Sequence, residues 1–290
     1  MLRMESETGW WLITHPDHAR LAGEFAAAWG NVQFRRPEPR ERVLKGIACH
    51  DDGWALRDAH PSITRQGKPS AFSTELVGKY SAFEEIDIAD YLAVRDRAVR
   101  IIAEHDPYAG LLISMHTYNL LTDHADRSTI APEGLALLDA FLEKQRAYQS
   151  DLRARIQVDP SLATLDKSEQ TILEHFRLLQ ACDNLSLLTC VAFLSPAHLL
   201  HPLPLNNGDN SEVLVSPVGP RHFRLAPWPF PEPEMTFTFP ARHIDGKNFP
   251  SSQALEDAFF AAPVEQLSVT LTNQGSSPGV PHEYAFGNHA

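Results

Sequence analysis

Cysteines, basic runs and long apolar runs are all scarce in this chain of 290 residues. Its three cysteines, Cys49, Cys182 and Cys190, include no Cys-x-x-Cys pair, which is typical of free, buried thiols in a reducing compartment. Asp, His or Pro interrupts every apolar stretch, so we predict that no segment spans a membrane. Residues 1–15 lack a basic stretch followed by an apolar run, so we expect no signal peptide and a cytoplasmic location.

The charge balance argues against nucleic acid as the main partner. Lys and Arg number 25 and Asp and Glu number 37, which gives a formal net charge of −12. An acidic chain repels phosphate backbones unless its basic residues cluster, and the longest basic run is the pair Arg35-Arg36. With 43% hydrophobic residues, a chain of this length can bury a core without a metal, so we expect any bound metal to serve chemistry.

Apolar residues recur at helical spacing over most of residues 1–195. Thr14, followed by Pro16 and Asp17, has the pattern of a helix N-cap and predicts a helix over residues 15–29 that carries His18 near its apolar face. A second helix is expected to run from Val43 into the pair His50-Asp51. Further helices are predicted over residues 88–104, 107–121, 134–158 and 168–194.

The composition changes after Pro196, where proline becomes frequent and apolar residues alternate. This pattern predicts short strands over residues 212–215, 223–225, 235–239 and 267–271, with a helix over residues 252–261 between two of them. We therefore predict a mainly α protein of the α+β class. Residues 1–195 would form a helical bundle, residues 196–272 a small antiparallel β appendage packed on it, and residues 273–290 a flexible tail.

The strongest motif lies in residues 46–54, where small and apolar residues lead into His50-Asp51 and Gly53 follows. Neighbouring residues on a helix point about 100° apart, yet a His and the next Asp can still meet one ion at the helix flank. Imidazole and carboxylate together suit Fe, Mn, Zn or Mg. We therefore expect a divalent metal ion as cofactor, with one or two ions per chain.

This stretch resembles the central motif of the HD-domain superfamily of metal-dependent phosphohydrolases. That motif has a His on one helix, a His-Asp pair on a second and an Asp on a later helix. His18 matches the first His, His50-Asp51 the pair and Asp183 the last Asp. The resemblance implies an HD-domain-like helical bundle whose metal ligands are His18, His50, Asp51 and Asp183. His116 corresponds to the additional His that members with two metals use.

The chain is also similar, over roughly residues 10–270, to a bacterial family known as domain of unknown function 3891. This family implies a fold and no substrate. The matching features are the Leu12-Ile13-Thr14 opening before His18, His50-Asp51-Asp52-Gly53-Trp54, Ser114-Met115-His116 and Gln180-Ala181-Cys182-Asp183.

One departure from the HD pattern bears on catalysis. Many catalytic members carry a Lys or a Glu shortly after the pair, whereas here Asp52, Gly53 and Trp54 follow. We interpret Asp51, Asp52 and His116 as catalytic residues, with Asp52 orienting a ligand His. Trp54 is close enough in sequence to His50 to form a wall of a substrate pocket.

The segment of residues 57–79 is locally basic in an acidic protein, with Arg57, Arg65, Lys68 and Lys79. Such a cluster beside a metal could receive an anionic group. We therefore expect an anionic small-molecule substrate, bound by Trp54, Arg65 and Lys68, and leave self-association into a homo-oligomer open. A solvated loop is the alternative interpretation.

Three functional hypotheses follow. The first is a metal-dependent phosphohydrolase acting on a small phosphoester or a nucleotide. The second is a di-iron oxygenase on the same scaffold, and the third is a non-catalytic binding or regulatory module. Two ligand assignments also have structural alternatives: Asp183 could form an ion pair with Arg177, and His116 could be a core histidine bonded to a backbone carbonyl.

Overall fold

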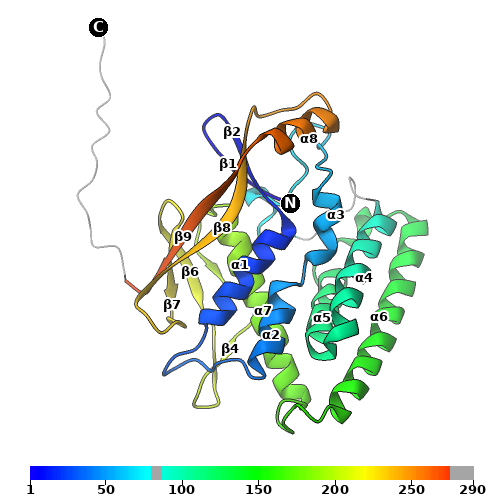
Figure 1. Cartoon of the computed structure of the whole chain (residues 1–290), viewed down its shortest axis with the longest axis vertical. Helices are drawn as coiled ribbons and strands as arrows, with labels where there is room; N and C mark the ends of the chain where they lie inside the picture. The colour runs from blue at the N-terminus through cyan, green and yellow to red at the C-terminus, as the bar shows by residue number, and fades with distance from the viewer. Residues whose placement is uncertain (80–86, 275–290) are drawn as a thin grey trace.

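A computed structural model describes residues 1–79 and 87–274 and shows a sheet on one side of the molecule with helices stacked against it (Figure 1). The sheet has seven strands in the order β1-β2-β8-β9-β7-β6-β3. Helices α1, α2 and α7 lie between this sheet and an outer group formed by α4, α5 and α6 (Figure 1). The protein is therefore a mixed α/β structure.

The strands of the sheet come from both ends of the chain. They are β1 (Leu2–Glu5), β2 (Gly9–Ile13), β3 (Ala197–His198), β6 (Leu214–Gly219), β7 (His222–Ala226), β8 (Glu234–Asp245) and β9 (Val264–Thr272). Neighbours pair antiparallel except β7 and β9, which run parallel. Two short strands, β4 (Leu203–Pro204) and β5 (Asn210–Ser211), form a separate pair.

Most helices begin and end close to the predicted residues. They are α1 (His15–Ala28), α2 (Arg40–Ala48), α3 (Ala55–Asp58), α4 (Ile88–His105), α5 (Pro107–Thr122), α6 (Pro132–Val158), α7 (Glu169–Cys190) and α8 (Ser252–Ala261), with short 3-10 turns η1 (Asp52–Trp54), η2 (Thr74–Leu76) and η3 (Arg127–Thr129). Thr14 caps α1 as predicted, because its side chain accepts a hydrogen bond from the backbone N–H of Asp17.

The predicted HD-domain-like helical bundle with a small C-terminal β appendage is wrong. The four strands predicted after Pro196 are present, but β1 and β2 join them in the same sheet, where Trp10 of β2 pairs with Ile244 of β8. The search for alternating apolar residues missed strand β2, because both of its faces are buried. Trp10 packs with Phe259 of α8, whereas Ile13 belongs to the main core. A strand buried on both faces shows no alternation of apolar and polar residues.

Helix α1 connects the sheet to the other helices. On the sheet side, the ring of Phe25 meets Phe237 of β8 edge to face, with ring centroids 4.8 Å apart. On the side of α2, a Cβ placed on Gly23 would lie 2.6 Å from the Cβ of Ala48. The two helices therefore touch almost backbone to backbone, which holds the end of α2 against α1 near His18.

Three further sequence predictions concern the whole chain. The cysteines are unpaired, as predicted. Among the helices of the described part, none combines the length and the apolar character that crossing a membrane requires. The tail predicted over residues 273–290 lies outside the described residues from residue 275 onwards.

Candidate metal centre

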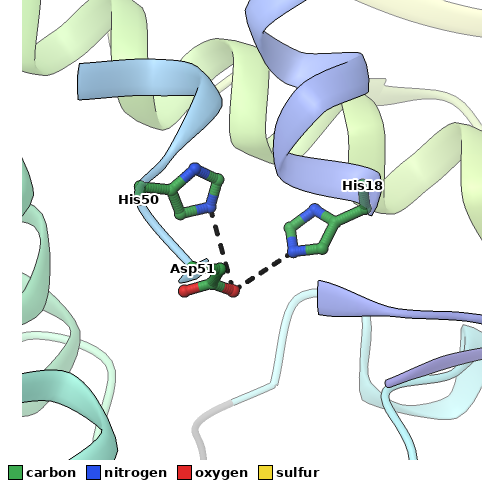
Figure 2. Close-up of side chains that lie close together, drawn as sticks. All are labelled: His18, His50 and Asp51. Carbon is green, nitrogen blue, oxygen red and sulfur yellow. Dashed lines mark hydrogen bonds and ion pairs between the residues drawn. The ribbon is translucent and has the colours of Figure 1, made fainter. Parts of the chain in front are cut away.

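Five buried polar side chains meet where α1, α5 and α7 pack around the end of α2. They are His18 on α1, His50 and Asp51 after α2, His116 on α5 and Asp183 on α7, and none is more than 7% exposed. The rings of His18 and His50 both point toward the carboxylate of Asp51 (Figure 2). The four metal ligands predicted from the sequence and the additional His116 are therefore brought together.

Each histidine of this cluster has an imidazole nitrogen within 4 Å of a carboxylate oxygen. The Nε2 atoms of His18 and His50 lie 3.2 Å and 3.9 Å from the same oxygen, Oδ2 of Asp51 (Figure 2). His50 Nε2 also lies 3.2 Å from Oδ1 of Asp183. His116 Nε2 is 3.8 Å from Oδ2 of Asp183. Asp183 therefore contacts histidines of the cluster and not Arg177, which was the alternative partner.

The pair His50-Asp51 lies just beyond a helix rather than on one. Helix α2 ends at Ala48, and the chain leaves it through Cys49 and Asp51, whose φ angles are −112° and −115°. His50 Nδ1 lies 2.7 Å from the carbonyl oxygen of Ile47 and donates to it. This bond fixes the ring, and it leaves Nε2 unprotonated and directed into the cluster when the imidazole is neutral.

His18 is held in the same way by Ser186 of α7. The hydroxyl of Ser186 donates to the backbone carbonyl of Asp183, at 2.8 Å, so its oxygen accepts from Nδ1 of His18, at 3.0 Å. Nε2 of His18 then carries the lone pair. Two imidazole lone pairs therefore face one carboxylate oxygen of Asp51, an arrangement that is repulsive unless a proton or a cation lies among them.

Unpartnered polar atoms provide a second test of whether the residues fit a metal. His50 Nε2 and His116 Nδ1 are buried and have no hydrogen-bond partner. Leaving such atoms unpaired in a protein interior costs free energy, and most buried polar atoms are paired. A divalent cation bound between nitrogen and carboxylate oxygen atoms would satisfy Nε2 of His50, so the donor set fits a metal of the Fe, Mn or Zn kind.

Within residues 1–79 and 87–274, two overlapping triads could hold such an ion. One is His18, His50 and Asp51, and the other is His50, His116 and Asp183, with the ligand atoms of each within 4.8 Å of one another. His50 belongs to both triads, and its Nδ1 is already bonded to Ile47. Because Nε2 has one lone pair, the two triads cannot both be complete at the same time.

Burial and the two carboxylates set the protonation of the cluster. Burial alone would lower the pKa of His50, but Asp51 and Asp183 outweigh it and raise this pKa to about 9. Burial lowers the pKa of His116 to about 3. For Asp183, burial opposes ionisation, yet the neighbouring histidines, His50 foremost, hold its pKa below the usual range. Both carboxylates are thus available as anionic ligands.

Arg95 on α4 is a component that the sequence interpretation missed. Its guanidinium donates to Oδ1 of Asp51 at 2.6 Å and to the hydroxyl of Tyr91 at 3.2 Å. Burial favours the neutral form of Arg95, but Asp51 outweighs it and raises the pKa of Arg95. The available signal was that Arg95 falls in the apolar stripe of its helix, where a charged residue needs a buried partner.

Backbone atoms make the contact between α4 and η1, the turn that follows the pair His50-Asp51. A Cβ on Gly53 would lie 2.2 Å from the carbonyl oxygen of Val94 and 2.8 Å from the backbone nitrogen of Ala98. Only a glycine fits at this position, which places α4 directly on η1. Gly53 thus allows Arg95 to reach Asp51.

A pocket with a volume of about 670 Å³ opens beside the cluster, and Arg95 lines it. The predicted substrate residues Trp54, Arg65 and Lys68 all line the same pocket. Trp54 is itself buried and stacks on His15, with ring centroids 4.3 Å apart. The pocket therefore extends from the basic segment of residues 57–79 to Arg95, which contacts the candidate metal ligand Asp51.

Two other residues near the motif lie outside both triads. Asp52, predicted to be catalytic, forms an ion pair with Arg20 at 3.4 Å and makes no hydrogen bond or ion pair with His18, His50 or His116. His15, at the start of α1, bonds instead to the buried carboxylate of Asp58, with Nδ1 and Oδ1 3.0 Å apart. No sequence pattern indicates the His15–Asp58 contact, since 43 positions separate the two residues.

The fold and this cluster define a mixed α/β protein with a buried His/Asp centre that could hold a metal ion. The chain belongs to the family described as protein of unknown function (DUF3891), whose model matches residues 1–246. A search of curated proteins and a search of solved structures each found no match. None of these findings links the chain to the HD-domain superfamily.

Proposed function

We propose that this protein is a metal-dependent phosphohydrolase that acts on a small phosphoester or a nucleotide. The observation that carries the proposal is the orientation of two imidazoles. His18 and His50 each use Nδ1 for a fixed hydrogen bond and aim Nε2 at one oxygen of Asp51. Asp183 closes the cluster 3.2 Å from His50. These four residues would hold one ion.

The ligand set supports a single ion more than a pair. His50 is common to both triads, so an ion that uses His50 leaves the other triad with two ligands. A bound ion of this kind lowers the pKa of its water and polarises a phosphoryl oxygen. His116, which lies 3.8 Å from Asp183, would then contact the ion or its water as an additional residue.

Arg95 supports phosphoester chemistry in particular. Many catalytic HD members carry a Lys or a Glu shortly after the His-Asp pair, and this chain has neither residue there. Our proposal nevertheless includes a distant relationship to that superfamily. Arg95 brings a cation to the same place from another helix, because it contacts Asp51 and also lines the pocket. Guanidinium groups match the geometry of phosphate oxygen atoms. Arg95 would thus orient a phosphoryl group next to the ligands.

The two alternative functions differ from this proposal in what they require. A di-iron oxygenase needs two ions at once, which the shared His50 argues against. A non-catalytic metal-binding module needs no substrate pocket, whereas a pocket of about 670 Å³ lined by Arg95 is present. Oxygen consumption with bound iron would favour the oxygenase, and bound metal without turnover would favour the module.

Metal content and hydrolysis, measured together, test the proposal. Elemental analysis of the purified protein should find close to one ion per chain. Phosphomonoesters and nucleotides should be hydrolysed when Mn, Fe, Mg or Zn is supplied. Asp183→Asn should lose both metal and turnover, while Asp151→Asn, an exposed carboxylate on α6 outside both triads, should retain both. Wild-type protein without metal, or full turnover in Asp183→Asn, would refute the proposal.

A further inference from the structure

The pocket beside the metal centre has an excess of positive charge that the chain as a whole does not have. Among the residues that the structure describes, six Arg and Lys side chains line it, against two carboxylates, although the protein carries a formal charge of −12. The six are Arg3, Arg57, Arg65, Lys68, Lys79 and Arg95. A concave surface with one sign of charge concentrates the field and attracts ligands of the opposite sign.

Only part of this charge is neutralised within the pocket. Arg3 faces Glu75 at 3.5 Å, and Arg95 is bonded to Asp51. The other lining carboxylate, Asp58, is bonded to His15. Among residues 1–79 and 87–274, no ion pair is formed by the remaining four basic side chains, Arg57, Arg65, Lys68 and Lys79.

Two of these four cations are carried by a structured turn, which we call the basic hairpin (residues 62–70). Its two sides are joined by hydrogen bonds from the N–H of Thr64 to the carbonyl of Lys68, at 2.8 Å, and from Ser70 to Ser62, at 2.7 Å. Gly67 makes the turn with a φ of +78°, and its carbonyl accepts a bond from the N–H of Phe249 at 2.8 Å. The backbone that carries Arg65 and Lys68 is therefore fixed before any ligand binds.

The pocket thus has two cationic regions with different partners. Arg95 lies against Asp51 of the metal centre, whereas Arg65 and Lys68 lie on the basic hairpin and form no ion pair among the described residues. The volume of about 670 Å³ lies within the range of small-molecule sites, roughly 300–1,000 Å³. One phosphate is far too small to fill it. A ligand that reaches both regions needs two anionic groups.

We propose that the substrate carries a second anionic group, phosphate or carboxylate, which Arg65 and Lys68 bind while the scissile phosphoryl group lies at the metal centre. This inference rests on the proposed function and specifies its substrate class, a small molecule with an anionic group at each end. The hairpin fixes the distance between the two groups, so it selects substrates by length as well as by charge.

Calorimetric titration with two uncleavable probes tests the inference. Tetramethylene bisphosphonate has a phosphonate at each end, and butylphosphonate has one. The metal-loaded wild-type protein should bind the bisphosphonate about tenfold more tightly, the factor expected for one additional charge-assisted contact. In Arg65→Gln/Lys68→Gln the two probes should bind equally, with the affinity for butylphosphonate unchanged. Bisphosphonates with shorter and longer methylene chains should show one preferred length.

A matched control and the opposing outcomes complete the experiment. Arg97→Gln/Lys167→Gln removes one Arg and one Lys that lie outside the pocket and form no ion pair among the described residues, and it should keep the tenfold preference. Equal binding of both probes to the wild type overturns the inference. So does a preference that survives in Arg65→Gln/Lys68→Gln, or loss of butylphosphonate binding in that variant. Metal content and turnover of the same preparations decide the proposed function separately.

Discussion

Two assemblies of histidine and carboxylate lie close together in this protein and differ in how fully they are satisfied. In the first, Asp58 accepts bonds from the amino group of Met1, at 2.9 Å, and from the backbone N–H of His15, at 2.5 Å. In the second, the Nε2 atoms of His18 and His50 face Asp51, and Nε2 of His50 has no hydrogen-bond partner. Hydrogen bonds within the protein satisfy the first assembly, whereas the second is satisfied only by a proton on His50 or by a cation.

This difference shows which features distinguish a metal centre from a structural ion pair. Burial does not separate them, because Asp58 and Asp51 are each 4% exposed. The orientation of the imidazoles does. Nδ1 of His15 lies 2.6 Å from the amino group of Met1, a donor, whereas Nδ1 of His50 bonds to the carbonyl of Ile47 and so turns the other nitrogen toward the carboxylates. Substitutions in the two assemblies should therefore have different consequences.

The largest effect is expected for Asp51→Ala. The substitution removes a ligand and leaves Arg95 buried without its partner, so the protein should lose its metal and roughly 3–5 kcal/mol of unfolding free energy. Urea denaturation and elemental analysis would measure both. Adding Arg95→Met should restore much of the stability and none of the metal. A variant that keeps its metal would show that Asp51 belongs to a structural pair.

Asp58→Ala should have a comparable effect on stability and none on metal. Removing this carboxylate leaves the buried amino group of Met1 without its anionic partner, at a cost of about 3 kcal/mol. Metal content per folded chain should equal that of the wild type, because neither residue belongs to a triad. If Asp58→Ala released the metal, the comparison between the two assemblies would fail.

The pH dependence should differ between the loaded and the metal-free protein. In the metal-free state the carboxylates raise the pKa of His50 to about 9, above the unfolded value of 6.5. Protonated His50 therefore stabilises the metal-free fold fully below pH 6.5, and this contribution is lost as the pH rises toward about 9. A bound ion must displace this proton, so metal affinity should increase up to about tenfold per pH unit in the same window. Calorimetry in buffers of different ionisation enthalpy would count the proton released, and a count of zero would contradict the assigned ligand.

The smallest effect is expected for Ser186→Ala, and it distinguishes the two triads. Ser186 contacts Nδ1 of His18 and no other ligand imidazole by a recorded hydrogen bond. If the ion uses His18, loss of this bond should weaken metal binding about tenfold, the lower end for such supporting contacts. Thr189→Ala, one turn further along α7, is the matched control. An unchanged affinity in Ser186→Ala would place the ion in the triad with His116.

Helix periodicity made most of the helical part of this fold predictable. Helices α4, α6 and α7 keep one face apolar over several turns, α5 is apolar on most sides, and helix starts carry recognisable caps such as Asp106 and Ser168. The sheet was harder to predict because β1 and β2 are short and β2 is covered on both faces. Strand β8, which pairs with β2, lies more than 200 residues away in the sequence, and no local pattern encodes that pairing.

The candidate site was predictable in its residues more than in its geometry. His18, His50, Asp51 and Asp183 stood out because polar residues interrupted apolar segments in a known order. The position of His50 beyond the end of α2 depends on the hydrogen bond to Ile47, which a helical reading does not anticipate. Contacts of Asp51 with Arg95, and of His18 with Ser186, join segments 44 and 168 positions apart and arise only from packing.

The close approach of Gly53 to α4 has a consequence for how this protein can diverge. Val94, whose carbonyl oxygen lies where a Cβ of Gly53 would fall, directly precedes Arg95. The distance between η1 and α4 is therefore set by two backbones, and substituting the neighbouring side chains cannot change it. Related chains could replace much of the surrounding core and still keep the guanidinium at the same distance from Asp51. Replacing Gly53 would move the guanidinium of Arg95 away from Asp51.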